Sequence, residues 1–162
     1  MLDLKSKLAV SALAGLLITL PLDEGGVTDK GAMPYKDVGG VLTVCYGHTG
    51  KDIENRRYTK DECLELLKVD TERHMKRVVS CMTREPTVGQ LKGFTSMDFN
   101  TGGWCGSRSN REFNKGNDKE SCRALAYGPS GQPVWSYVDG TFWAGLHKRR
   151  IRESKECYAG LG

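Results

Sequence analysis

The sequence lacks the features of disordered and repetitive proteins. It contains 5 prolines among 162 residues, and it has no internal repeat, low-complexity tract or interdomain linker. The content of 38% hydrophobic and 27% charged residues is sufficient to bury one core. These absences argue against disorder and predict one globular domain.

The sequence has no C-x-x-C pair, which argues against a zinc site. Its cysteines are at least 17 residues apart and are Cys45, Cys63, Cys81, Cys105, Cys122 and Cys157. An even number of well-spaced cysteines is compatible with three disulfides in an oxidising compartment, or with buried thiols in the cytosol. We expect neither a metal nor a cofactor, and the compartment decides the state of the thiols.

No apolar run is long enough for an ordinary transmembrane span. Residues 8–22 carry no charge and follow Lys5 and Lys7, which is typical of export. As a helix this run measures about 22 Å, less than the roughly 30 Å of a hydrocarbon core. The A-x-A pattern at 12–14 lies inside the run, which disfavours cleavage. A signal peptide, a weak signal anchor and a buried core helix all remain open.

An excess of positive charge favours anionic partners. The net charge is +4 and the isoelectric point is near 8.7. Nucleic acid, lipid headgroups and bacterial wall polymers all fit this charge, and so does a simple contribution to solubility.

Local patterns predict an α+β fold. A small hairpin is expected around the Gly39–Gly40 turn. Capping-box patterns begin a long helix at Thr59 and a second helix at Thr87. Shorter helices are expected at 110–115 and 118–125, and a terminal helix at 141–157, whose basic run 148–152 we interpret as a solvated face. The predicted architecture is a small β-hairpin lobe and a larger helical lobe, joined by the long helix, with a cleft between them for a polymer.

Two acidic residues could carry glycoside hydrolysis. This reaction needs an acid for the leaving oxygen and a second group that assists water or stabilises the oxocarbenium-like transition state. Glu24 follows the apolar run, where desolvation favours the protonated form, whereas Asp37 beside Lys36 favours the ionised form. With 20 acidic residues in the chain, chance could supply such a pair.

Longer motifs give the pair more weight. They are Glu24-Gly25, Pro34-Tyr35-Lys36-Asp37, the run from Gly40 to His48, Tyr58 to Cys63, Phe99-Asn100-Thr101-Gly102, Ser121 to Leu125, and Gly145 to Arg150. Together they resemble glycoside hydrolase family 24, the phage lysozymes, over about residues 22–157. The resemblance implies a lysozyme-like fold and a muramidase that cleaves the β-1,4 bond between N-acetylmuramic acid and N-acetylglucosamine in peptidoglycan.

The resemblance also implies catalytic roles. Glu24 would be the general acid, while Asp37 and Thr43 would position and activate the attacking water, as in an inverting hydrolase. Glu24 and Asp37 are 13 residues apart, which makes the intervening loop about four residues longer than in the family. Asp23 is an adjacent rival to Glu24, but the Glu-Gly pair matches the family pattern and a surface loop can absorb extra residues.

Further roles follow from the same resemblance. Asn100 and Gly102 would line the substrate cleft, although Asn100 could instead cap the helix that it ends. His48 is expected to form a structural ion pair with Asp70 and not to act in catalysis. The three tryptophans suit a core or a sugar-stacking surface equally well; they are Trp104, Trp135 and Trp143.

We interpret residues 1–22 as a signal anchor and 23–162 as the catalytic domain. Seven of the fifteen residues in the apolar run are small, polar or helix-breaking, so retention in the membrane should be marginal. Lys5 and Lys7 would keep the amino end cytoplasmic and place the rest in the periplasm. This resembles the signal-arrest-release endolysins, which are freed when the membrane is depolarised and then lyse the host cell. The expected protein is a monomer with peptidoglycan as partner, a transient tether to the host inner membrane and no nucleic acid.

Export would place every thiol in an oxidising compartment, so we expect three disulfides. Of fifteen possible connectivities we favour the sequential one. The expected pairs are Cys45 with Cys63, Cys81 with Cys105, and Cys122 with Cys157.

Two other functions remain open. A lytic transglycosylase needs one acid/base but no positioned water, so the Asp37 and Thr43 pair argues against it. A non-catalytic cationic protein that binds the wall or the membrane would rest only on the net charge and the basic terminal helix.

Overall fold

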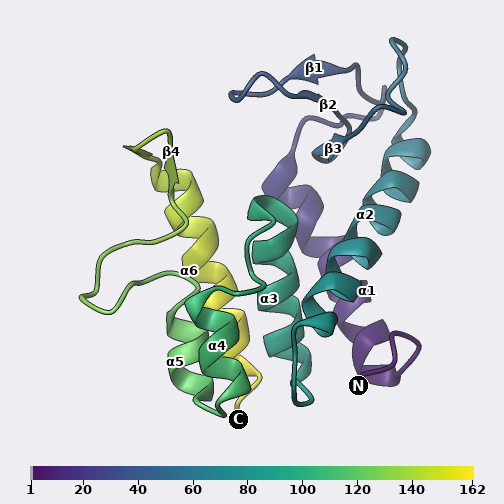
Figure 1. The fold of residues 1–162 in the computed structure, drawn as a ribbon. Coiled ribbons are helices and arrows are strands. Elements are labelled where there is room, and N and C mark those ends of the chain that lie inside the picture. Colours follow the sequence, from purple (N-terminus) through teal and green to yellow (C-terminus); the bar gives the residue numbers. More distant parts are fainter. Residues whose placement is uncertain (1) are drawn as a thin grey trace. The chain divides into compact units, whose positions relative to one another are not determined.

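The computed structural model describes residues 2–162, which contain six helices and five short strands (Figure 1). In chain order the elements are α1 (Lys7–Glu24), β1 (Tyr35–Lys36), β2 (Leu42–Val44), β3 (His48–Thr49), α2 (Lys60–Ser80), α3 (Val88–Thr101), α4 (Arg108–Asn114), α5 (Asp118–Arg123), β4 (Tyr137–Val138), β5 (Thr141–Phe142) and α6 (Ala144–Ala159). The predicted α+β class is confirmed. The chain forms two compact units, one made of Leu17–Glu72 and the other of the residues up to Leu16 together with Arg73–Gly162.

The smaller unit contains a three-stranded antiparallel sheet in the order β1-β2-β3. Tyr35 and Thr49 flank Thr43 on either side in the register of this sheet. The expected turn at Gly39–Gly40 joins β1 to β2, and β2 ends where Cys45 takes the left-handed region, with φ 60°. A disulfide joins Cys45 to Cys63 in α2, with the Cα atoms 5.0 Å apart, and so ties the sheet to this helix.

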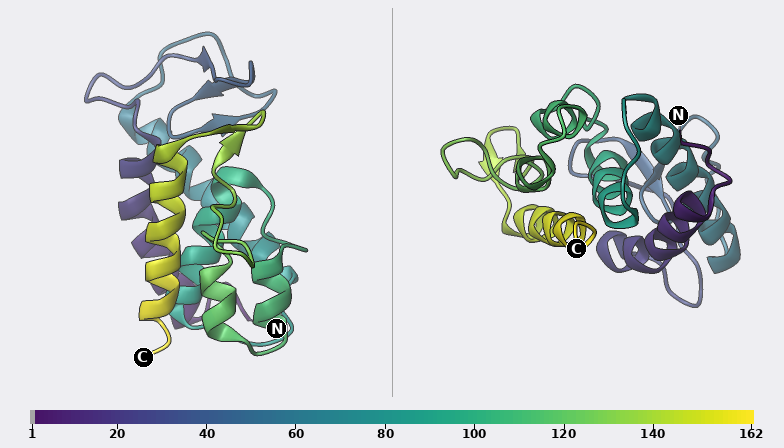
Figure 2. Two further views of the ribbon diagram at one scale, coloured as in Figure 1. Left: turned by 90° about the vertical axis from the view of Figure 1, so that its left-hand side faces the viewer. Right: turned by 90° about the horizontal axis from the view of Figure 1, so that it is seen from below.

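The larger unit is helical, and α3 and α6 lie side by side in it (Figures 1 and 2). Glycines at 89 and 93 permit this close approach. A Cβ at Gly89 would lie 2.4 Å from the carbonyl oxygen of Glu156, and one at Gly93 would lie 2.7 Å from that of Glu153. Both positions therefore require glycine for steric reasons, because a side chain would push the two helices apart.

A buried aromatic cluster forms the core of this unit. The ring of Phe94 stacks on Trp104 with centroids 4.5 Å apart and meets the edge of Phe113. All three side chains are completely buried. The indole N–H of Trp104 donates to Ser109 Oγ, so burial leaves no polar atom of this ring unpaired.

Both predicted capping boxes form. The backbone N–H of Glu62 donates to Thr59 Oγ1, and the backbone N–H of Thr59 donates to the Glu62 carboxylate. Thr87 and Gln90 make the same reciprocal pair at the start of α3. At the start of each helix, two backbone N–H groups that have no partner within the helix are thus hydrogen-bonded.

The apolar N-terminal segment is folded as α1. Its buried residues are Ala9, Ala12, Leu16 and Leu20, and they recur every three or four positions along one helical face. Among residues 2–162, no helix combines the length and the apolar character that a membrane crossing requires.

The C-terminal part corrects two expectations. The terminal helix begins at Ala144 and not at Thr141, because residues 137–142 form the β4–β5 hairpin. Only part of the basic run is a solvated face: Lys148 and Arg152 are exposed, whereas Arg149 and Arg150 are buried beside Glu153. Burial raises the pKa of Glu153 despite the two guanidinium groups.

Candidate active site

Glu24 is the last residue of α1. It is partly buried, and its carboxylate lies over Gly47, where a Cβ would be 2.9 Å from Glu24 Oε2. Gly47 has a φ of 81°, which together with this contact favours glycine. The helix end and the turn before β3 thus place the carboxylate against the backbone of the sheet region.

The long loop after Glu24 closes on itself. Thr28 and Gly31 exchange both backbone hydrogen bonds around a two-residue turn, and Ala32 exchanges both with Tyr58. Gly31 has no room for a side chain, because a Cβ would lie 1.8 Å from the Tyr58 carbonyl oxygen. The residues between Glu24 and Asp37 therefore include an anchored turn.

Asp37 lies in the turn between β1 and β2 and is exposed. Its Oδ1 accepts hydrogen bonds from the backbone N–H groups of Gly39 and Val41, each at 2.9 Å. These two hydrogen bonds fix the orientation of the carboxylate in the turn. Thr43 is buried on β2, and its hydroxyl donates to the Val41 carbonyl at 2.9 Å. The backbone of Val41 therefore holds both side chains.

Tyr35 joins this group, although the sequence did not single it out as a site residue. Partial burial raises the pKa of Tyr35, and the charges of Glu24 and Asp37 raise it further. Its ring thus lies within electrostatic reach of both carboxylates. In the register it is opposite Thr43. The Tyr-x-Asp spacing is the signal that could have identified it.

His48 lies between two carboxylates. Its Nδ1 is 2.7 Å from Asp70 Oδ2, which is the ion pair expected from the sequence, and its Nε2 is 3.0 Å from Asp52 Oδ2. Burial alone would lower the pKa of His48, but the hydrogen bonds and charges of Asp70 and Asp52 outweigh burial and raise it. Both ring nitrogens are occupied by these contacts, which favours a structural role.

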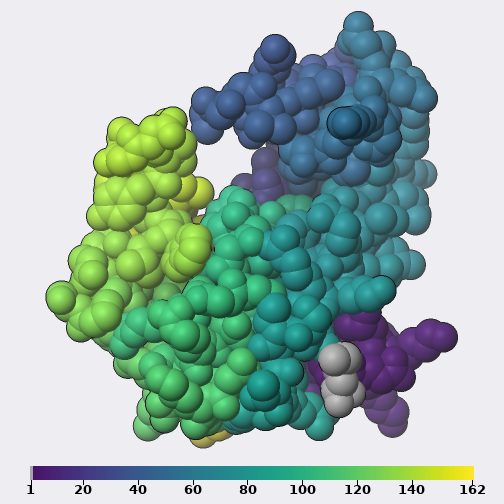
Figure 3. Space-filling model, in the orientation of Figure 1, coloured from purple at the N-terminus to yellow at the C-terminus, as the bar shows by residue number. Residues whose placement is uncertain are grey.

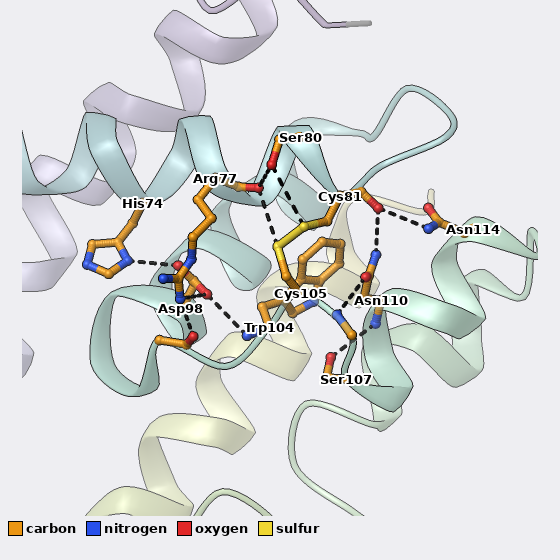
Figure 4. Close-up of a disulfide and its surroundings, with 12 residues drawn as sticks. His74, Arg77, Ser80, Cys81, Asp98, Trp104, Cys105, Ser107, Asn110 and Asn114 are labelled. Atoms are coloured by element: carbon orange, nitrogen blue, oxygen red, sulfur yellow. Dashed lines mark hydrogen bonds and ion pairs between the residues drawn. A yellow bond between two sulfur atoms is a disulfide. The ribbon is translucent and has the colours of Figure 1, made fainter.

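The segment around Asn100 belongs to the larger unit. Gly102, with φ 70°, is the C-cap of α3, so Asn100 is an exposed residue in the last turn and not the cap. Arg77 in α2 donates to the Gly102 carbonyl oxygen and to Asp98 (Figure 4). This helix end is therefore held in place by a charged side chain.

Asp98 is completely buried and was not predicted as a key residue. It accepts hydrogen bonds from Arg77 and from the backbone N–H of Trp104, and it pairs with His74 Nδ1 at 2.7 Å (Figure 4). Burial would raise the pKa of Asp98, but the hydrogen bonds from these three partners outweigh burial and lower it. The disulfide between Cys81 and Cys105 joins the loop after α3 to the end of α2 (Figure 4).

The cysteines form the sequential set of disulfides that the sequence analysis favoured. The pairs are Cys45–Cys63, Cys81–Cys105 and Cys122–Cys157. Among the described residues no cysteine is free, and no group of three or more histidines, cysteines and acids could hold a metal ion.

The comparisons with known proteins define first the fold and then the family. The structure is similar to that of the endolysin from Escherichia coli O157:H7 phage FAHEc1, with a TM-score of 0.72 and 20% identity over 94% of each chain. This shows a lysozyme-like fold. Residues 28–153 match the phage lysozyme family, and the chain belongs to that family of lysozyme-type hydrolases.

Two relatives refine this placement. The chain is 38% identical to the SAR-endolysin of Bacteriophage PS119, over 92% of this chain and 87% of that protein. It is 37% identical to the SAR-endolysin of Enterobacteria phage PA-2, over 92% of this chain and 88% of that protein. The family and the type of endolysin recognised in the sequence are confirmed, and the expected localisation agrees with the name of these relatives.

Proposed function

We propose that this chain is an exported endolysin that hydrolyses the β-1,4 bond between N-acetylmuramic acid and N-acetylglucosamine, and so lyses the host cell. The observation that carries the proposal is the grouping in one compact unit of Glu24, Asp37 and Thr43, around the backbone of β2 and the adjacent turns. The reaction class needs an acid and a second group that assists the attacking water, and the carboxylates of Glu24 and Asp37 in this unit support these two roles.

The hydrogen bonds support a separate catalytic role for each of the three residues. Protonated Glu24 donates its proton to the glycosidic oxygen as the C–O bond breaks. A water molecule attacks the anomeric carbon and loses a proton to Asp37, whose Oδ1 already has two donors, so that Oδ2 can accept. The Thr43 hydroxyl donates to Val41, which leaves its lone pairs to accept a hydrogen bond from the same water. Attack on the face opposite the leaving group would invert the configuration.

The direct test is the loss of turbidity of outer-membrane-permeabilised cells. We expect Glu24→Gln to be inactive because the leaving oxygen loses its proton donor, and Asp37→Asn to lose at least about a hundredfold in rate. Thr43→Ala should lose as much as Asp37→Asn or less. Glu24→Gln and Asp37→Asn should retain the unfolding temperature of the wild type, and Thr43→Ala should remain folded at the assay temperature, which separates loss of chemistry from loss of fold.

Asp23→Asn is the matched control, because it removes the neighbouring carboxylate and leaves Glu24. An active Glu24→Gln with an inactive Asp23→Asn would reassign the acid. Unchanged rates in both Asp37→Asn and Thr43→Ala would refute the inverting mechanism. An anhydro-sugar end in the products would identify a lytic transglycosylase.

The name of the relatives supports export to the periplasm with an initial tether at the inner membrane through the N-terminal segment. The burial of one face of α1 supports a released state in which the same segment is part of the folded enzyme. Glu24 ends this helix, so membrane insertion would hold the acid at the membrane surface.

A further inference from the structure

The β4–β5 hairpin is a short ribbon of aromatic residues in the larger unit. Asp139 and Gly140 form its turn with φ 48° and 79°, the two left-handed values of a type I′ turn. Tyr137 and Phe142 are directly opposite in the register, and their rings meet edge to face at 5.6 Å. The hairpin is therefore a defined structure that presents its rings as a pair.

Four aromatic side chains on or next to this ribbon are exposed, and we call them the aromatic platform. Trp135 is 38% exposed, Tyr137 49%, Phe142 44% and Trp143 47%. They are four of the six large aromatic side chains that are exposed in residues 2–162. The hairpin lies uncovered at the surface of its unit in the space-filling view, where it is lime (Figure 3). Clustered rings that stay in contact with water mark a binding surface.

Trp135 connects the platform to the predicted substrate segment. A Cβ at Gly103 would lie 2.7 Å from Cη2 of Trp135, so this glycine makes room for the indole. Gly103 directly follows Gly102, and Asn100 is one helical turn earlier. Trp135 itself has a φ of 57°, a left-handed backbone conformation that is rare for a bulky residue and costs conformational energy.

The charge of this region distinguishes between possible occupants. Residues 127–147 contain a single formally charged side chain, Asp139, and neither lysine nor arginine. Lys148, directly after this range, is exposed, whereas Arg149 and Arg150 are buried. An anionic lipid surface is attracted by clusters of exposed basic residues, and residues 127–147 contain none. A sugar ring has an uncharged face of C–H groups, and such a face packs on the electron-rich face of an aromatic ring.

We infer that the aromatic platform binds the glycan strand of peptidoglycan by stacking on its sugar rings, next to the Asn100–Gly102 segment. This inference rests on the proposed function, since it assigns a further binding surface for the same polymer. The rings would contribute binding that is equal in the ground state and the transition state, so they would act on affinity and not on the chemical step.

The test is cosedimentation of the full-length oxidised protein with purified peptidoglycan sacculi on ice, in a Glu24→Gln background. We expect the double variant Phe142→Ala and Trp143→Ala to lose at least about tenfold in affinity, because each ring contributes about three- to tenfold. Tyr158→Ala is the matched control, since Tyr158 is also an exposed aromatic residue but lies on α6. It should bind as Glu24→Gln alone does.

The rate of sacculus hydrolysis separates the hypothesis of the aromatic platform from that of the proposed hydrolase. In the wild-type background the double variant should need more substrate for half-maximal rate and keep its maximal rate. Unchanged affinity for sacculi would overturn the platform even if Glu24→Gln is inactive, and the proposed hydrolase would stand. Lost affinity together with an active Glu24→Gln would support the platform and overturn the assigned acid. Lost binding to vesicles of phosphatidylglycerol and phosphatidylethanolamine, with sacculus binding intact, would assign the surface to a membrane and overturn the glycan.

Discussion

At the scale of single residues, the buried pair of His48 and Asp70 links stability to pH. The pKa of His48 is raised above its ordinary value of 6.5 in the folded state. A raised pKa means that the folded protein holds the proton more tightly than the unfolded chain does. The stabilisation is therefore complete below pH 6.5 and is lost as the pH rises through the folded-state pKa.

We predict that Asp70→Asn lowers the free energy of unfolding by about 3 kcal/mol at pH 5.5, as expected for the loss of one partner of a buried ion pair. The loss should be smaller at pH 8, because a smaller fraction of His48 is protonated there than at pH 5.5. Urea unfolding at the two pH values measures the difference, and Asp52→Asn is the control because Asp52 is largely exposed. An equal loss at both pH values would contradict a pair that depends on protonated His48.

Some of the residues of the candidate site and of the buried ion pairs could be predicted from the sequence, and others could not. Glu24, Asp37, Thr43 and His48 stand in contiguous motifs, so their spacing was visible in the chain. Asp98 was missed because its importance comes from His74 and Arg77, more than twenty residues earlier. Arg149 and Arg150 were placed on the surface because a basic run gives no sign of the buried Glu153 that pairs with them.

At the scale of elements, the packing of α3 on α6 depends on Gly93. A Cβ at this position would lie 2.7 Å from a backbone oxygen of α6 and 3.3 Å from Cys157 Cβ. We predict that Gly93→Ala lowers the free energy of unfolding by about 1–3 kcal/mol, as overpacking does in other cores. Urea unfolding at pH 7 measures this loss.

Gly145→Ala is the matched control for that substitution. Gly145 lies in the first turn of α6, and nothing stands within 4 Å of the position that a Cβ would take. Alanine should therefore gain about 0.5–1 kcal/mol from helix propensity alone. Equal effects of the two substitutions, in either direction, would refute the close-approach argument.

The elements that could be predicted from local sequence are those with local start signals. The two capping boxes placed the starts of α2 and α3, and they form as expected. The β4–β5 hairpin was missed although Asp139–Gly140 is a strong turn signal, because the basic sequence after it favoured an early start for the terminal helix. The packing of α1 into the core could not be decided locally, since its apolar run was compatible with a signal peptide, a weak signal anchor and a core helix.

At the scale of the whole molecule, the proposed tether assigns α1 to the membrane before release and to the folded enzyme after it, and the exposed residues of α1 offer a way to separate these two roles. Ser11 and Ala14 are exposed, whereas Ala12 is completely buried and Gly15 lies against Lys92. Leucine at the two exposed positions should strengthen the membrane anchor without disturbing the folded helix. Leucine at Ala12 or Gly15 would instead damage the packing of the released enzyme.

We predict that the double variant Ser11→Leu and Ala14→Leu stays in the membrane fraction after depolarisation and delays lysis. Fractionation and culture turbidity measure these effects. Glutamine at the same two positions adds bulk without apolar character and is the control. Release of the leucine variant at the rate of the wild type would refute the tether, and so would a wild type whose first 22 residues have been cleaved.

The three disulfides have one more consequence, which lies in the order of their cysteines along the chain. No pair interleaves with another, because each bridge closes before the next begins, over separations of 18, 24 and 35 residues. For a chain that emerges amino end first, the correct partner of each unpaired thiol is always the next thiol to arrive. Of the fifteen possible pairings, the order of arrival alone selects the native one. Export that begins at the amino end can therefore produce the native disulfides without later thiol–disulfide exchange.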